Sequence, residues 1–563
     1  MADPTRLLPP LIPLPGGAWQ ATSVLTPQAF KLRGLALMPP NDVIPVMVVP
    51  GIMGSNLRAK PRPRSEEERS KEIAPGKPAW RPPNTMPGGL WNALVWDGYK
   101  PVRRQHLLDA DTLEVDEDGP PHIPHRDGRL HVHPKLARER GWGELHADSY
   151  GELLCALETR LNRTFLHDNE SGERSIQRHW REVMDCDPAK WGMPNMTPLS
   201  EAELEKHATH YFPVYGVGYN WLECCEKASR RLERRIVDTI AYWTGMGRKC
   251  KQVIVVTHSM GGLVARACAK RIPDRIAGVI HGAMPALGAP AAYRRMTCGT
   301  EAQDFVGQFA ARILGATTYD TTPVLATSPG ALELLPNHLY PGPWLHVRVV
   351  HGSGAAGTRE TAVDYLHLPD GVRPDPYKFY RDMTPWYRLV DPALADPAGK
   401  YRRQPGGIVG AIKEAIDAAE TFHKKYLGDY YHPNSYAFYG DDPKQLAFGR
   451  VRWLGRKDSG SRTALTPANV KQASFAGHHE GVGRVVHIDP GCSLLFKPEP
   501  PDSSGDRTVP AQSGAGPDGK VQHLFRTCGY DHQGAYNNDD MLMLTLRLVV
   551  RIVQECHEVL SGK

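Results

Sequence analysis

The chain has 563 residues, 41% of them apolar, and a formal net charge of +6. This length allows one large elaborated domain or two to three smaller ones. The net charge is small for a chain of this size, so the composition predicts no nucleic-acid binding, although it mildly favours anionic membrane surfaces.

Targeting and redox signals are few. The N-terminal residues lack a basic region followed by an unbroken apolar stretch, so we expect no signal peptide. No apolar run reaches about eighteen residues, which predicts no transmembrane helix and peripheral membrane contact only. The ten cysteines include no C-x-x-C pair, a pattern typical of reduced thiols in a protein made in the cytoplasm.

The first predicted core strand follows a Pro-rich segment, residues 1–40, that we interpret as a surface arm. Residues 43–49 are apolar and lead into the loop PGIMGSN. Such a loop, early in an α/β chain, is a common position for a backbone donor to a reacting oxyanion, and the candidate donor is the N–H of Ile52. The alternative is a plain turn at a strand end.

A charged, Pro-rich insertion is expected at about 58–145. It contains four histidines that could suggest a metal site: His122, His125, His131 and His133. His131 and His133 would share one face of a strand, but no carboxylate or cysteine lies at a recurrent ligand spacing. We therefore interpret these histidines as surface residues and expect no metal.

The predicted core begins at 41 and runs to about 300. A capping box at residues 200–203 starts a helix, and an amphipathic helix at 222–242 leads into an apolar strand at 253–257. Another helix and a strand at 276–280 follow. This alternation of helices and strands predicts an α/β fold with a parallel, doubly wound sheet.

Ser259 occupies the break between the strand and the helix that starts at Gly261. A serine on such a sharp turn exposes its hydroxyl, and the N–H of Met260 at the helix start can bind an oxyanion. Thr257 and His258 precede the serine, with Thr257 in place of the usual glycine of a nucleophile elbow. The alternative is an ordinary strand-loop-helix with a surface serine.

Regular alternation lapses between 301 and 429, where we expect a cap over the site or, alternatively, a separate domain. The helical patterns in this region cover 305–314, 327–335 and 408–426. Residues 430–563 are expected to complete the core, with a strand at 436–439 and a helix from about 539.

This last segment holds the candidates for a catalytic acid and base. Asp506 lies in the Gly-containing loop SSGDRTVP, where an aspartate can be held still to orient an imidazole. Asp441 and Asp442 follow a strand end and are alternative acids. His532 is the candidate base, with His478 and His479 as weaker rivals. The chain order serine, aspartate, histidine is that of α/β-hydrolases.

Several blocks carry a family resemblance. The blocks PGIMGSNLRAK, GYNW, THSMGG, ALGAP, YAFYG and GDRTVP resemble the lecithin:cholesterol acyltransferase and lysosomal phospholipase A2 group of α/β-hydrolases. The segments VIVVTHSMGGLVARA, GAMPALGAPAAYRRM and GYDHQGAYNN resemble, more specifically, the antibacterial lipase effectors of type VI secretion, in their third family. The resemblance covers about half the chain, and Arg507 departs from the usual acid-loop motif.

The resemblance implies a serine phospholipase that acts on membrane glycerophospholipids through Ser259, Asp506 and His532, without a cofactor. It also implies delivery by type VI secretion into a rival cell's periplasm, with a cognate immunity protein and a secretion spike or adaptor as partners. The alternatives are a housekeeping carboxylesterase or lipid acyltransferase with the same triad, and a catalytically silent hydrolase fold that serves as a binding module.

Overall fold

The computed structural model describes residues 5–9, 11–23, 33–82, 98–121, 123, 132–167, 173–301, 315–351, 362–371, 374–457 and 462–560. The helix expected at 305–314 and the histidines His122, His125 and His131 lie outside these residues. His133 is described, and it caps a helix instead of lying in the expected strand.

The core is a six-stranded sheet in which every pair of neighbouring strands is parallel. The predicted parallel α/β architecture is therefore confirmed. Its strands, in spatial order, are β13 (Val214–Gly216), β6 (Val46–Val49), β14 (Val253–His258), β15 (Ile276–Gly282), β18 (Ser435–Gly440) and β25 (His523–Thr527).

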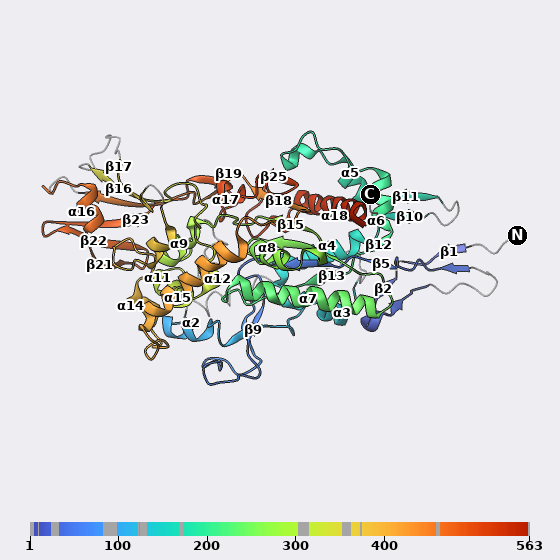
Figure 1. Cartoon of the computed structure of the whole chain (residues 1–563), viewed down its shortest axis with the longest axis horizontal. Coiled ribbons are helices and arrows are strands. Elements are labelled where there is room, and N and C mark those ends of the chain that lie inside the picture. The colour runs from blue at the N-terminus through green and yellow to red at the C-terminus, as the bar shows by residue number, and fades with distance from the viewer. Residues whose placement is uncertain are drawn as a thin grey trace.

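Helices cover both faces of this sheet (Figure 1). Successive side chains of a strand point to opposite faces, so Val46 and Val48 pack in one core cluster and Met47 and Val49 in another. The first cluster includes residues of α4 (Ala147–Leu161) and α18 (Asp539–Leu560), and the second those of α7 (Cys225–Gly245) and α8 (Gly261–Arg271). This arrangement fixes the strand ends that carry the site.

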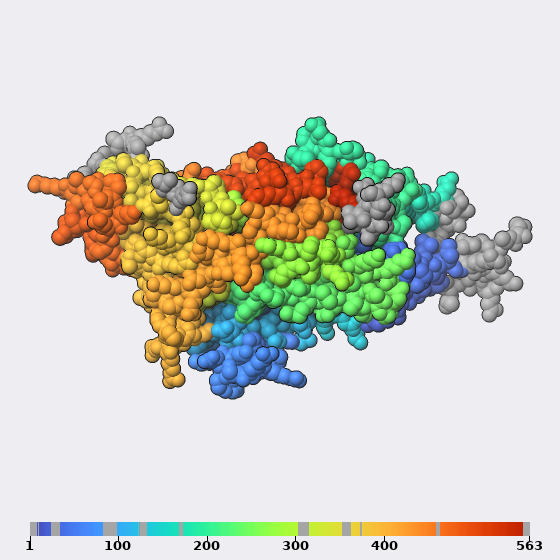
Figure 2. All heavy atoms as spheres, in the orientation of Figure 1, coloured from blue at the N-terminus to red at the C-terminus, as the bar shows by residue number. Residues whose placement is uncertain are grey.

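A second six-stranded sheet lies at one end of the elongated molecule, away from the N terminus (Figures 1 and 2). Only its β16–β20 pair is parallel. Its strands, in spatial order, are β17 (Ala362–Leu368), β16 (Leu345–His351), β20 (Val451–Lys457), β23 (Cys492–Pro498), β22 (Gly483–Asp489) and β21 (Ser474–His479).

The second sheet takes strands from both sides of β18 in the sequence. The chain leaves the core sheet after β15, returns for β18, and leaves again before β25. In the sequence, helices lie before and between the strands of this sheet: α9 (Pro290–Cys298), α11 (Thr318–Leu325), α12 (Pro329–Leu332), α13 (Pro376–Arg381), α14 (Pro392–Ala395), α15 (Gly407–Thr421) and α16 (Pro467–Gln472). Residues 430–563 thus contribute to both sheets.

The insertion before α4 forms a small three-stranded sheet of its own. Its strands are β7 (Leu57–Ala59), β8 (Pro78–Trp80) and β9 (Leu113–Val115). In the sequence, α2 (Pro101–Leu107) lies between β8 and β9, and α3 (Pro134–Glu139) follows β9. The capping box at Ser200 and Glu203 is present at the start of α6 (Glu201–Ala208), as predicted. Within the described residues, no helix combines the length and apolar character needed to cross a bilayer.

Candidate active site

Ser259 lies in the turn between β14 and α8 with a φ of 53°, a left-handed conformation that is strained for a non-glycine residue. The turn needs glycine at position 261, because a Cβ there would lie 2.5 Å from the carbonyl oxygens of Val49 and Pro50. Thr257 fits at the position of the missing glycine because its hydroxyl donates to the Ile280 carbonyl at 3.3 Å. The predicted elbow residues thus form a tight strand-to-helix turn.

His532 connects Ser259 to Asp506. Its Nε2 lies 2.7 Å from Ser259 Oγ, and its Nδ1 lies 2.8 Å from Asp506 Oδ2. Asp506 is 1% exposed, and its other carboxylate oxygen accepts hydrogen bonds from the N–H groups of Thr508 and Val509. The three side chains that the sequence singled out are therefore joined by hydrogen bonds in the order Ser259, His532, Asp506, called here the relay.

The alternative acids have other partners. The carboxylate of Asp441 binds Ser504 and Arg526, and that of Asp442 accepts N–H bonds from Lys444 and Gly529.

The rival histidines lie in β21 of the second sheet, where His478 pairs with Asp391 at 2.9 Å. Among the described residues, Asp506 is the carboxylate that contacts His532.

The loop after β6 passes directly beside the serine. A Cβ at Gly51 would lie 2.9 Å from Ser259 Cβ and 3.4 Å from its Oγ, so this approach requires glycine. The next residue is Ile52, whose amide was predicted to bind an oxyanion together with that of Met260. Within the described residues, neither amide donates to a backbone carbonyl in the turns and loops.

His258 and Tyr150 link the loops of the site. The Tyr150 hydroxyl accepts the N–H of Gly51 at 2.9 Å and lies 2.7 Å from His258 Nδ1. His258 Nε2 lies 2.8 Å from the carbonyl oxygen of His532. Burial, then the nearby His532, lowers the pKa of His258 to about 3, so the ring is neutral and can donate from Nε2 while Nδ1 accepts.

A cavity of about 440 Å³ opens beside Ser259 and His532. Most of its lining is apolar, and the charged side chains in it are Arg295, Glu301 and Arg507. Arg295 and Glu301 form an ion pair at 2.7 Å. The apolar lining residues include Ile52, Met53, Trp80, Met296, Leu325 and Leu334. Such a cavity can take an apolar chain next to the hydroxyl of the serine.

Sequence reasoning missed several of these residues. Tyr150 belongs to α4, 108 positions before His258, and no local pattern marked it. Glu301 is the first residue of the segment expected to form a cap and Arg295 lies just before it, but their pairing was not predicted. The position of His258 beside the serine did not predict its two hydrogen bonds, which the structure adds.

No protein-family model and no curated protein sequence matches this chain. The search of solved structures found a similar chain in the crystal structure of the Tle4–Tli4 complex. Its TM-score is 0.71 and its sequence identity 28%, over 91% of this chain and 98% of that one. This chain resembles a type VI lipase effector.

The predicted resemblance to lipase effectors of type VI secretion is confirmed. The similar structure is that of an effector named Tle4, so assignment to the third family stays a prediction. Phospholipase PlaB from Legionella pneumophila also matched, at a TM-score of 0.14 and 10% identity over 57% of this chain and 78% of that one, which is too low to carry an argument.

Proposed function

We propose that the protein is a serine hydrolase of the α/β-hydrolase fold that cleaves acyl ester bonds of membrane glycerophospholipids. The observation that carries the proposal is the Ser259–His532–Asp506 relay at an apolar cavity of about 440 Å³. The relay supplies a nucleophile and a base, and the cavity matches a fatty acyl chain in chemical character.

In this mechanism Ser259 Oγ attacks the ester carbonyl carbon while His532 Nε2 takes the hydroxyl proton. Asp506 keeps the imidazole oriented and stabilises its charged form. The N–H groups of Ile52 and Met260 bind the oxyanion. Removal of one such donor typically lowers the rate by about a hundredfold or more. His532 then gives its proton to the leaving alcohol, and water, activated by His532, releases the fatty acid from the serine.

The segment 301–429 acts as a cap in this proposal. The support is that residues of α11 and α12 line the cavity beside Ser259. Residues 1–40 form the surface arm, and 41–300 and 430–563 contribute the two parts of the core. Of the second sheet, the strands β20 to β23 come from residues beyond the boundary at 429.

The protein acts as an antibacterial effector delivered by type VI secretion to the target-cell periplasm. The support is the similarity to Tle4, which was solved together with Tli4. By analogy, a cognate immunity protein binds this chain in the producing cell, and a secretion spike or adaptor carries it. The mild positive charge suits brief contact with an anionic bilayer surface.

The test is fatty-acid release from vesicles of phosphatidylethanolamine and phosphatidylglycerol by the wild type and by Ser259→Ala. We expect release by the wild type and none by the variant, with equal thermal stability of the two proteins. Cleavage of a soluble ester without release from vesicles would instead favour a carboxylesterase. Transfer of the acyl group to an added alcohol, in place of free fatty acid, would favour an acyltransferase.

A further inference from the structure

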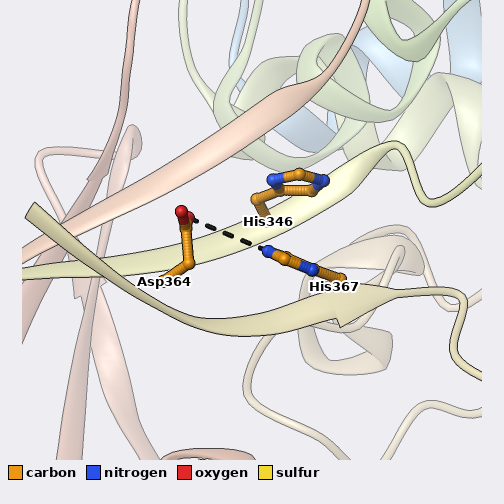
Figure 3. Close-up of side chains that lie close together, drawn as sticks. All are labelled: His346, Asp364 and His367. Atoms are coloured by element: carbon orange, nitrogen blue, oxygen red, sulfur yellow. Dashed lines mark ion pairs between the residues drawn. The ribbon is translucent and has the colours of Figure 1, made fainter.

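Two histidines and an aspartate gather on one face of the second sheet (Figure 3). His346 on β16 lies directly opposite His367 on the neighbouring antiparallel strand β17. The register shifts between Val347 and Arg348, so that Arg348 lies opposite Asp364. This bulge brings Asp364 to the same face as His367, three residues later, although strict alternation would place them on opposite faces.

The donor atoms of the three side chains all lie within 4.8 Å of one another. His367 Nε2 is 4.0 Å from Asp364 Oδ1, and the two imidazole rings have centroids 4.2 Å apart. In the part of the chain that the structure describes, no other group of three or more histidine, cysteine, aspartate or glutamate side chains meets this distance.

We propose that His346, Asp364 and His367 form a binding site for a divalent transition metal ion, with Zn²⁺ as the expected occupant. Two imidazole nitrogens and one carboxylate oxygen are borderline and hard donors that suit zinc, and three protein ligands leave a fourth tetrahedral position for water. His367 and Asp364 are largely exposed, so a metal ion has direct access from solvent. Small side-chain rotations would bring the two imidazoles from their tilted arrangement to converge on one ion.

Arg348 is the cation that competes with the metal, because its Nε lies 3.1 Å from Asp364 Oδ1. The same guanidinium is also 3.2 Å from Glu499, through Nη1. Arg348 can therefore stay paired with Glu499 while Asp364 turns an oxygen toward a metal. The nearby positive charge lowers the metal affinity, so the site binds zinc more weakly than a closed structural site would.

The site is separate from the serine chemistry. None of its three side chains lines the cavity beside Ser259. A bound ion would join the edge strand β17 to β16. A ligand that binds the folded protein but not the unfolded chain stabilises the folded protein. We therefore expect the metal to raise the stability of the second sheet without being required for ester cleavage.

The experiment measures Zn²⁺ binding to the full chain after chelator treatment, by equilibrium dialysis with metal analysis, at neutral pH. All proteins carry Cys528→Ser, because Cys528 is an exposed thiol that could itself bind zinc. The test variants are His367→Ala and Asp364→Asn. The matched control is His487→Ala, which removes an exposed histidine of β22 in the same sheet.

We expect one ion per chain in the parent and the control, with a rise in unfolding temperature on zinc addition. Loss of one ligand should weaken binding by at least about tenfold, since removal of a residue that only hydrogen-bonds a metal ligand already has an effect of this size. Equal binding by His367→Ala and the parent, or no binding by the parent, would overturn the proposal. Because the readout is metal content, the result does not depend on phospholipase activity.

Discussion

At the scale of single residues, the choice of acid is open to direct test. Asp506→Asn removes the charge that orients His532, so we expect kcat to fall by about four orders of magnitude. Asp441→Asn is the matched control, because Asp441 is a partly buried aspartate with an ion pair of its own. Its kcat should stay close to the wild-type value, and the reverse pattern would reassign the acid.

The Tyr150 hydroxyl is predicted to hold the site together. Tyr150→Phe leaves the Gly51 N–H and the His258 ring without their partner, which costs about 1–3 kcal/mol of stability. We expect kcat to fall, with KM little changed, because the loop that carries Ile52 is no longer fixed. The measurement is steady-state kinetics together with denaturant unfolding.

Tyr380→Phe is the control for that comparison. It removes another buried tyrosine hydroxyl, which donates to the Pro336 carbonyl at 2.6 Å and does not line the cavity. A similar loss of stability with unchanged kcat is expected. Equal losses of kcat in both variants would show that Tyr150 acts through general stability alone.

The sequence allowed the prediction of Ser259, Asp506 and His532 because each lies in a short motif with its own local chemistry. The partners of His258 could not be predicted in the same way. Tyr150 and the His532 carbonyl reach it across 108 and 274 positions, and only the folded sheet brings them together.

At the scale of secondary-structure elements, the close approach of α8 to β6 gives a matched pair of variants. Gly261→Ala places a Cβ 2.5 Å from two backbone carbonyl oxygens, and overpacking of this kind costs about 1–3 kcal/mol. Gly245→Ala, at the end of α7, meets no atom within 4 Å and should stabilise the helix by up to about 1 kcal/mol. Denaturant unfolding of both variants tests this, and destabilisation of both by similar amounts would contradict it.

The core elements were predictable because their patterns are strong. The strand expected at 253–257 and the helix expected to start at Gly261 match β14 and α8 within one residue. The second sheet was not predicted, because the segments that form its strands carry no local sign of their partners. The pairing of β16 with β20 joins segments more than a hundred residues apart.

At the scale of the whole molecule, buried histidines predict sensitivity to acid. Burial is the main cause that lowers the pKa of four histidines from the ordinary value of 6.5 to about 3 or 4. They are His207, His258, His281 and His423. The unfolded chain therefore binds protons that the folded one does not, so stability is full above pH 6.5 and falls as the pH drops toward these values. Each histidine contributes about 1.4 kcal/mol per pH unit within that window.

The measurement is the free energy of unfolding between pH 7 and pH 4.5. His207→Gln should reduce the slope by the contribution of one histidine, since glutamine can still donate to the Leu161 carbonyl. Glu333 opposes the trend, because burial raises its pKa to about 8 and its contribution to stability is lost as the pH rises from 4.5 toward 8. A slope that is unaffected by His207→Gln would contradict the assignment.

The most direct measurement of the central claim is covalent labelling by a fluorophosphonate, which reacts with an activated serine whatever the natural substrate is. We predict one label per chain, located by peptide mass spectrometry at Ser259, and its loss in Ser259→Ala and His532→Ala. The distance of 2.7 Å between Ser259 Oγ and His532 Nε2 is the physical reason for that reactivity. Labelling at another residue, or none in the wild type, would contradict the claim that these three side chains form a catalytic triad.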